Sequence, residues 1–189
     1  MSDEQKKILE KQLWAVANEL RGKMNADEYK NYILGFIFYK YLSEKLENYV
    51  NKKLLASEKI LFSEIKENTK EGKQYIEHLH KACVDHLGFF LKPTEVFSYL
   101  VKKGKGEIKD QTTFILEDLK NILNNIEKTS AGTASEDDFK GLFDDMDLTS
   151  SKLGSRENDK NEVVTIVLSH LAGIDFKLED TKSDLLGDA

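Results

Sequence analysis

Apolar side chains surround almost the whole circumference of one predicted helix, which begins near Ala26 and continues to about Leu55. Asn25 and Glu28 form the pattern of a capping box at its start, where each side chain satisfies a backbone N–H of the first turn. A helix that is apolar on nearly all sides has to be covered by other helices. We therefore expect this segment to be the centre of the fold. Because it is long for a globular helix, we expect a bend or break near Gly35 or Ser43.

Amphipathic patterns on either side of this segment predict its covering helices. Residues 3–24 carry one apolar stripe, and residues 57–87 indicate two helices, over 61–68 and 73–87, the second ended by Gly88. A short helix is expected to open at Pro93 or Thr94. The lysine- and glycine-rich stretch 102–111 predicts a loop, and apolar positions at helical spacing predict a further helix over 112–128.

The last part of the chain alternates between polar segments and short helices. Residues 129–135 read as a linker, a short helix follows around Phe139, and 144–159 is polar and irregular. Residues 161–171 form the last predicted helix; their β-branched side chains leave a strand as the alternative, although length and flanking residues favour a helix. Since no strand alternation occurs elsewhere, we predict an all-α protein, a multi-helix bundle around the 26–55 helix with no substantial sheet.

Composition narrows the class of protein. The chain has 189 residues, 40% of them hydrophobic and 33% charged, with a single proline, and these values fit one compact domain. No apolar run is long enough to span a membrane and the start of the chain has no signal-peptide pattern, so we expect a cytoplasmic protein. The net charge of −6 predicts weak or no DNA binding by the isolated chain, because DNA-binding domains are usually basic.

Two clusters invite a metal interpretation, and neither satisfies it. His80, Cys83 and His86 recur every third residue of a predicted helix, but their side chains fan over too wide an arc to converge easily on one ion. Asp145, Asp147, Thr149 and Ser151 alternate like the first ligands of an EF-hand loop. That loop also needs a glycine and a closing glutamate, where this chain has Ser150 and Arg156. We expect a partly buried thiol beside surface imidazoles, and a solvated acidic loop.

Five segments together resemble one known family: the N-terminal helical domain of the modification subunit, a DNA adenine-N6 methyltransferase, of type I restriction-modification systems. The segments are 13–24 (LWAVANELRGKM), 25–46 (NADEYKNYILGFIFYKYLSEKL), 87–101 (LGFFLKPTEVFSYLV), 142–154 (LFDDMDLTSSKLG) and 171–189 (LAGIDFKLEDTKSDLLGDA). The resemblance implies a complex with a specificity subunit, a second modification subunit and a restriction subunit. It also implies double-stranded DNA in that complex, and S-adenosylmethionine as the cofactor of the full-length protein.

The motifs that adenine methylation needs do not occur in these residues. Such enzymes hold S-adenosylmethionine with a glycine-rich loop after a strand and the flipped base with an Asn/Asp-Pro-Pro-aromatic element. Here the only proline is Pro93, and Gly104 and Gly106 follow a helical pattern. We therefore expect no catalytic, cofactor or metal residues and no enzymatic activity in this chain. We expect residues 1–173 to form a helical domain, and 174–189 to form a linker that leads to an S-adenosylmethionine-dependent methyltransferase domain absent from this sequence.

Two groups of residues are candidates for binding. The basic tract Lys102, Lys103, Lys105 and Lys109 is a candidate contact for nucleic acid in the assembled complex. The family's SSKLG element and its neighbour are a candidate docking site for a partner subunit, through Ser151, Lys152, Leu153, Gly154 and Arg156, with Leu148 and Leu153 exposed. The alternative function from another class is a stand-alone helical interaction or regulatory module without enzymatic activity.

Overall fold

The computed structural model of the chain describes residues 3–175. Its helices are α1 (Asp3–Leu20), α2 (Ala26–Tyr49), α3 (Lys70–Leu87), α4 (Phe97–Gly104), α5 (Leu116–Ser130), α6 (Glu136–Phe139) and α7 (Glu157–Ala172). A π-helical turn, η1 (Val50–Leu54), continues α2, and a 3-10 turn, η2 (Phe62–Glu64), precedes α3. Residues 3–175 contain no strand, only an isolated bridge between Arg21 and Met24. The prediction of an all-α fold is confirmed, while the predicted linker 174–189 lies almost wholly outside the described residues.

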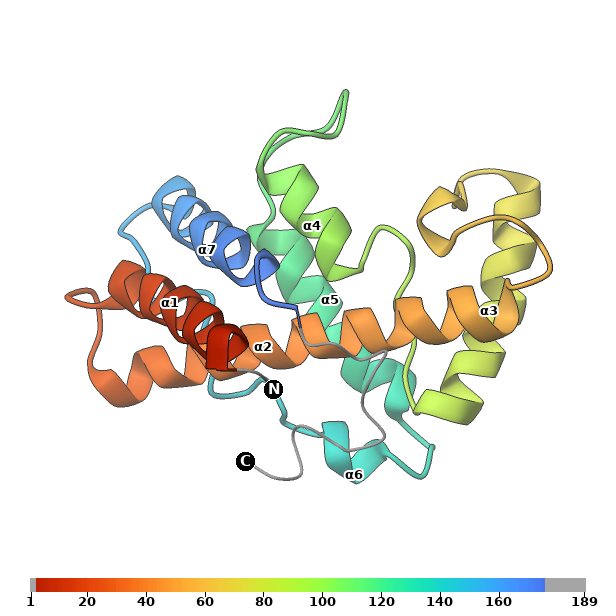
Figure 1. Cartoon of the computed structure of the whole chain (residues 1–189), viewed down its shortest axis with the longest axis horizontal. Helices are drawn as coiled ribbons and strands as arrows, with labels where there is room; N and C mark the ends of the chain where they lie inside the picture. The colour runs from red at the N-terminus through yellow and green to blue at the C-terminus, as the bar shows by residue number, and fades with distance from the viewer. Residues whose placement is uncertain (1–2, 176–189) are drawn as a thin grey trace.

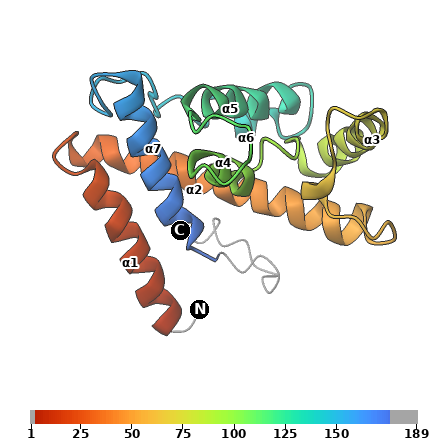
Figure 2. The same cartoon turned by 90° about the horizontal axis from the view of Figure 1, so that it is seen from above.

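Helix α2 is the centre of the fold, as the sequence predicts. It runs along the length of the molecule, and α1, α4 and α7 all pack against it (Figures 1 and 2). Its start is the predicted capping box: the Asn25 side chain accepts from the Glu28 backbone N–H at 2.9 Å, and Glu28 accepts from that of Asn25 at 3.0 Å. Tyr32, Phe36 and Tyr39 are buried in the core. Burial of these rings removes apolar surface from water and so contributes to the stability of the arrangement.

The predicted bend in this helix occurs elsewhere. α2 continues unbroken through Gly35 and Ser43, and the winding changes only at η1. Gly35 instead permits close packing, because a Cβ there would lie 2.8 Å from the sulfur of Met146. The Ser43 hydroxyl accepts a hydrogen bond from the backbone N–H of Phe97 at 3.1 Å and so caps the start of α4. Both small residues therefore serve contacts with distant segments of the chain.

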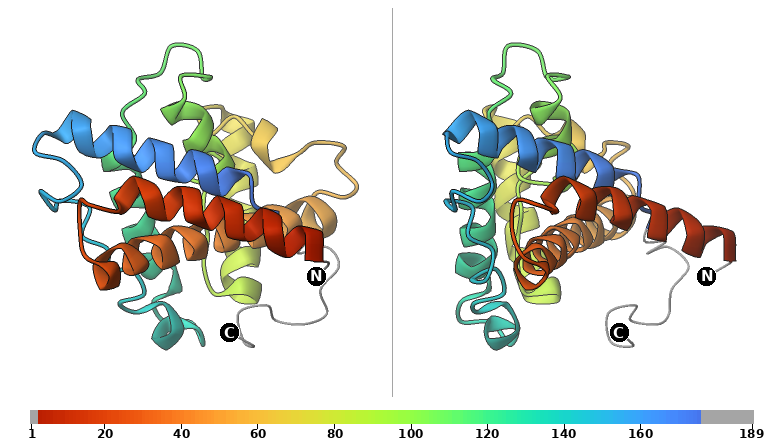
Figure 3. Two further views of the ribbon diagram at one scale, coloured as in Figure 1. Left: turned by 60° about the vertical axis from the view of Figure 1, so that its left-hand side comes forward. Right: turned by 90° about the vertical axis from the view of Figure 1, so that its left-hand side faces the viewer.

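Helices α1 and α7 lie side by side against one end of α2 (Figure 3). α7 also contacts α4 and α5, so it connects α1 to these two helices. It begins at Glu157, four residues before the predicted start, and its helical conformation excludes the alternative of a strand. α1 ends at Leu20 and not at Met24, and Gly22 with φ of +83° lies in the turn that leads to α2.

The segment before α3 is the clearest error of the sequence analysis. The predicted helix over 61–68 is reduced to the η2 turn, because the backbone becomes extended at the buried Ile65, where ψ is 118°. The Asn51 side chain accepts from the backbone N–H of Phe62 at 2.8 Å and so caps the start of this turn. The short helix expected at Pro93 or Thr94 begins at Phe97. α3 ends as predicted at Gly88, whose φ is +82°. None of the helices within residues 3–175 has both the length and the apolar character to cross a membrane.

Candidate functional site

The basic tract divides between a helix end and a loop. Lys102 and Lys103 belong to the last turn of α4, and Lys105 is its C-cap, so the predicted loop over 102–111 starts later than expected. The Glu107 N–H donates to the Lys102 carbonyl at 2.9 Å, and the Gly106 N–H donates to that of Lys103 at 3.0 Å. These bonds form a Schellman motif, in which the residue after the cap is left-handed; Gly106 has φ of +74°. The partial negative charge at the C-terminal end of the helix also stabilises these lysine cations.

The far end of the loop is held by α7. The side-chain oxygen of Asn161 accepts from the backbone N–H groups of Ile115 at 2.7 Å and Leu116 at 3.2 Å. These two residues are the N-cap and the first residue of α5. Its amide nitrogen donates to the carbonyl of Thr113 at 3.2 Å. Sequence reasoning missed Asn161, because a polar residue in a helix gives no sign of a partner 46 residues earlier. The 105–115 loop is thus fixed at both ends.

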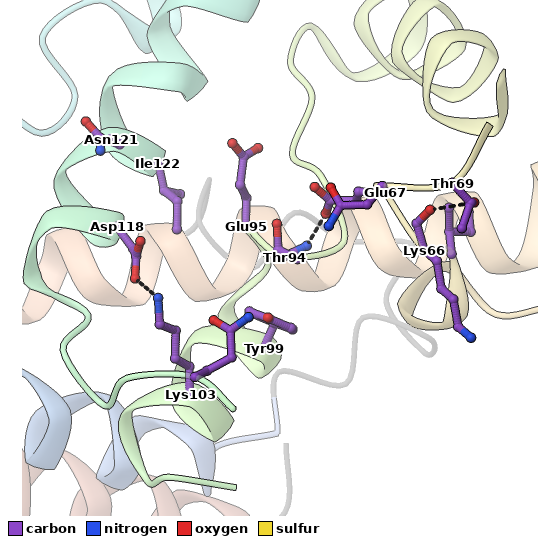
Figure 4. Close-up of a pocket in the computed structure, with 13 residues that line it drawn as sticks. Lys66, Glu67, Thr69, Thr94, Glu95, Tyr99, Lys103, Asp118, Asn121 and Ile122 are labelled. Atoms are coloured by element: carbon purple, nitrogen blue, oxygen red, sulfur yellow. Dashed lines mark hydrogen bonds and ion pairs between the residues drawn. The ribbon is translucent and has the colours of Figure 1, made fainter. Parts of the chain in front are cut away.

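Lys103 lines a cleft of about 670 Å³ between the 65–69 segment, α4 and α5, where its ammonium group faces Asp118 (Figure 4). Its ammonium group forms an ion pair with the Asp118 carboxylate at 2.5 Å, and its side chain is only 11% exposed. Across the cleft the Thr94 backbone N–H donates to the Glu67 carboxylate at 2.7 Å. Lys102, Lys105 and Lys109 are exposed. The four lysines of the predicted tract are therefore not one surface.

The SSKLG element is mostly turned inward. Leu153 is 0% exposed and Leu148 is 7% exposed, so the expectation that both leucines are exposed is wrong. Gly154 lies against the start of α7, where a Cβ would be 2.6 Å from the Cβ of Asp159 and 2.8 Å from the backbone nitrogen of Lys160. A polar segment of this kind can still bury single leucines, because its turns direct them to the core. Residues 147–156, which contain this element, lie between the starts of α2 and α7, and we call this segment the strap.

One ion pair and two hydrogen bonds join the strap to its two neighbouring helices. Lys152 is paired with Glu28, the capping-box residue of α2, and this lysine lowers the pKa of the Glu28 carboxyl. The buried Lys160 donates to the Thr149 carbonyl at 2.8 Å and to Glu157 at 2.7 Å. Tyr32 adds a hydrogen bond of 2.5 Å from its hydroxyl to the Asp147 carbonyl. The strap thereby connects the starts of α2 and α7.

Three members of the docking group, Ser151, Lys152 and Arg156, keep an outward position. Ser151 is exposed, and the Arg156 side chain is 81% exposed although it pairs with Asp159 at 2.9 Å. That guanidinium group lowers the pKa of the Asp159 carboxyl, because it donates hydrogen bonds to the ionised form. Lys152 is half exposed beside its pair. The face of the strap that a partner can reach therefore consists of polar and charged groups.

The side chains considered above as possible metal ligands make other contacts in the structure. His86 stacks on Tyr49 with ring centroids 4.5 Å apart, and the His80 and Phe90 ring centroids are 5.1 Å apart. Cys83, which lies between the two histidines in the sequence, is buried in the core. Asp147 accepts from the backbone N–H and the hydroxyl of Thr149, at 2.9 and 2.6 Å, as a turn residue. Across residues 3–175 no three His, Cys, Asp or Glu side chains are grouped so as to hold a metal ion.

Comparisons with known proteins agree with this geometry. A family model described as the HsdM N-terminal domain matches residues 9–171. The type I restriction enzyme MpnII methylase subunit of Mycoplasma pneumoniae is 33% identical over 193 residues, which cover 98% of this chain and 34% of that protein. The crystal structure of the type I restriction-modification system methyltransferase subunit from Streptococcus thermophilus matches with a TM-score of 0.70 at 29% identity, over 92% of this chain and 35% of that one.

The chain thus spans about a third of the length of both relatives. The family match covers α2, the cleft, the 105–115 loop and the strap. Its limits enclose four of the five segments whose sequence resembles the modification subunit, and only the first residue of the fifth, 171–189. The chain belongs to the HsdM N-terminal domain family of type I restriction-modification methyltransferase subunits.

Proposed function

We propose that this chain is a non-catalytic assembly domain of a type I modification subunit, which helps to close the complex around DNA. The observation that carries the proposal is the family match over residues 9–171, on a chain that spans about a third of its methyltransferase-subunit relatives. The whole subunit methylates adenine N6 at a site chosen by the specificity subunit. S-adenosylmethionine and the flipped adenine bind in the part that corresponds to the other two thirds of the relatives.

The all-helical architecture supports this division of labour. Within the described residues, the buried apolar side chains form one core around α2. The contacts between these elements are helix on helix, and such packing holds the surfaces of the domain in fixed positions. In the assembled enzyme the domain contacts the specificity subunit, a second modification subunit and the restriction subunit. The outward polar part of the strap, Ser151, Lys152 and Arg156, is the proposed docking surface for one of these subunits.

Two measurements test the proposal. Calorimetric titration of the 189-residue chain with S-adenosylmethionine is expected to give no binding, and micromolar binding would contradict a cofactor site elsewhere. In the second, the full-length subunit is compared with a subunit that lacks residues 1–173, each mixed with the specificity subunit and DNA. The shortened subunit is expected to keep cofactor binding and to lose the two-to-one assembly measured by light scattering. Normal assembly and methylation without residues 1–173 would overturn the proposal and favour a stand-alone module.

A further inference from the structure

We propose that the 105–115 loop is an arm that contacts the phosphate backbone of double-stranded DNA through Lys105 and Lys109, whereas Lys103 makes no DNA contact. This inference rests on the proposed function, because the DNA is held by the assembled complex. It divides the basic tract at the level of single residues.

The arm is supported at its base and free at its tip. The Schellman motif around Gly106 fixes its first residues, and the Asn161 side chain fixes its last residues at Ile115 and Leu116. Between these anchors the loop stands clear of the helices, beyond the ends of α4 and α5 (Figures 1 and 3). An arm that is already ordered loses less conformational entropy when it binds than a flexible loop does. Its projection also carries its charges away from the acidic body of the domain.

The state of the lysines differs along the tract. Lys105 and Lys109 are exposed, and neither forms an ion pair within the described part of the chain. Lys103 is held in the cleft by Asp118. Lys102 is exposed but lies within electrostatic reach of the half-buried Glu47. Lys105 and Lys109 are thus the two cations that can approach a polyanion without first breaking a contact.

The type of contact follows from the side chains. Lysine is a compact point charge, which suits phosphate oxygens and reads no base sequence. The whole chain has a net charge of −6, so attraction to DNA has to come from local cations that project from it. Glu107 and Asp110 lie on the same arm and balance the two lysines, so residues 105–115 carry no net charge and any attraction to phosphate is local to the two ammonium groups. The arm therefore contributes a moderate and sequence-independent share of affinity, added to contacts made elsewhere in the complex.

The test uses the full-length subunit assembled with the specificity subunit on DNA. Binding constants are measured over a range of salt concentrations for the wild type and for the K105A/K109A double variant. Log K falls with log salt, and each lost phosphate contact makes this slope less steep by about 0.9. The double variant is therefore expected to make the slope less steep by about 1.8. The loss should be equal for target and non-target DNA. An unchanged slope would overturn the arm as a DNA contact.

Matched controls separate the arm from general charge effects. The K70A/K81A double variant removes two exposed lysines from α3 and the same net charge, and its slope should equal that of the wild type. Equal losses from both double variants would overturn the assignment to the arm. K103M should leave the slope unchanged; a loss of about 0.9 would overturn its assignment to the cleft.

Assembly is measured first by light scattering, so that the two proposals fail separately. A complex that assembles normally without residues 1–173 contradicts the proposed function. A K105A/K109A complex that assembles and keeps the wild-type salt slope contradicts only the arm.

Discussion

Truncation of Leu153 distinguishes a core residue from a docking residue. The SSKLG pattern places this leucine in a polar segment, where the sequence predicts exposure, yet its exposed fraction is 0%. Leu153→Ala removes buried methyl groups and leaves a cavity, and such changes cost 2–5 kcal/mol; for a fully buried leucine held in a short strap we expect about 3 kcal/mol. For a domain of this size that value lowers the thermal midpoint by about 6–12 °C.

The chain offers a matched control for this measurement. Leu34 lies on α2 and is 42% exposed, so Leu34→Ala removes the same atoms from a site that is open to water. We expect it to change stability by less than about 0.5 kcal/mol, since surface substitutions rarely do more. Both variants are unfolded by heat and by urea, with circular dichroism as the signal. Equal midpoints for the two variants, together with weaker subunit binding by Leu153→Ala alone, would refute the burial argument.

Three further predictions concern the strap, the cysteine and the half-buried carboxyl of Glu47. Gly154→Ala should destabilise the chain by about 1–3 kcal/mol in urea unfolding, because its Cβ would lie 2.8 Å from the backbone nitrogen of Lys160; a neutral effect would mean that α7 can move aside. Burial raises the pKa of the Cys83 thiol to about 12, so Cys83 should react with alkylating reagents only at the rate of unfolding, and rapid labelling of the folded chain would contradict this. Burial also raises the pKa of Glu47, so the folded chain should lose stability as pH rises from about 4.5 through that raised value. Glu47→Gln should flatten this loss, and an identical pH profile would contradict the assignment.

The sequence by itself determined the class of fold and its centre. Apolar residues at a period of 3.6 and the Asn25–Glu28 capping box depend only on local geometry, and α2 begins where they predict. Gly88 ends α3 for the same reason, because its left-handed conformation is a local property of the chain. The resemblance of five segments to the modification subunit also needed no structure. These features share one cause: the information lies within a few residues.

Only the tertiary structure decided which side chains are available. Lys103 and Lys105 are two residues apart and look alike in the sequence, but Asp118 lies 15 residues further on and holds only the first. Leu153 is buried because the strap crosses the starts of α2 and α7, which no local pattern records. The predicted helix over 61–68 ends after one turn because the backbone becomes extended at Ile65, whose side chain is buried in the core. Burial and pairing depend on partners that are distant along the chain, and a periodic pattern holds no information about them.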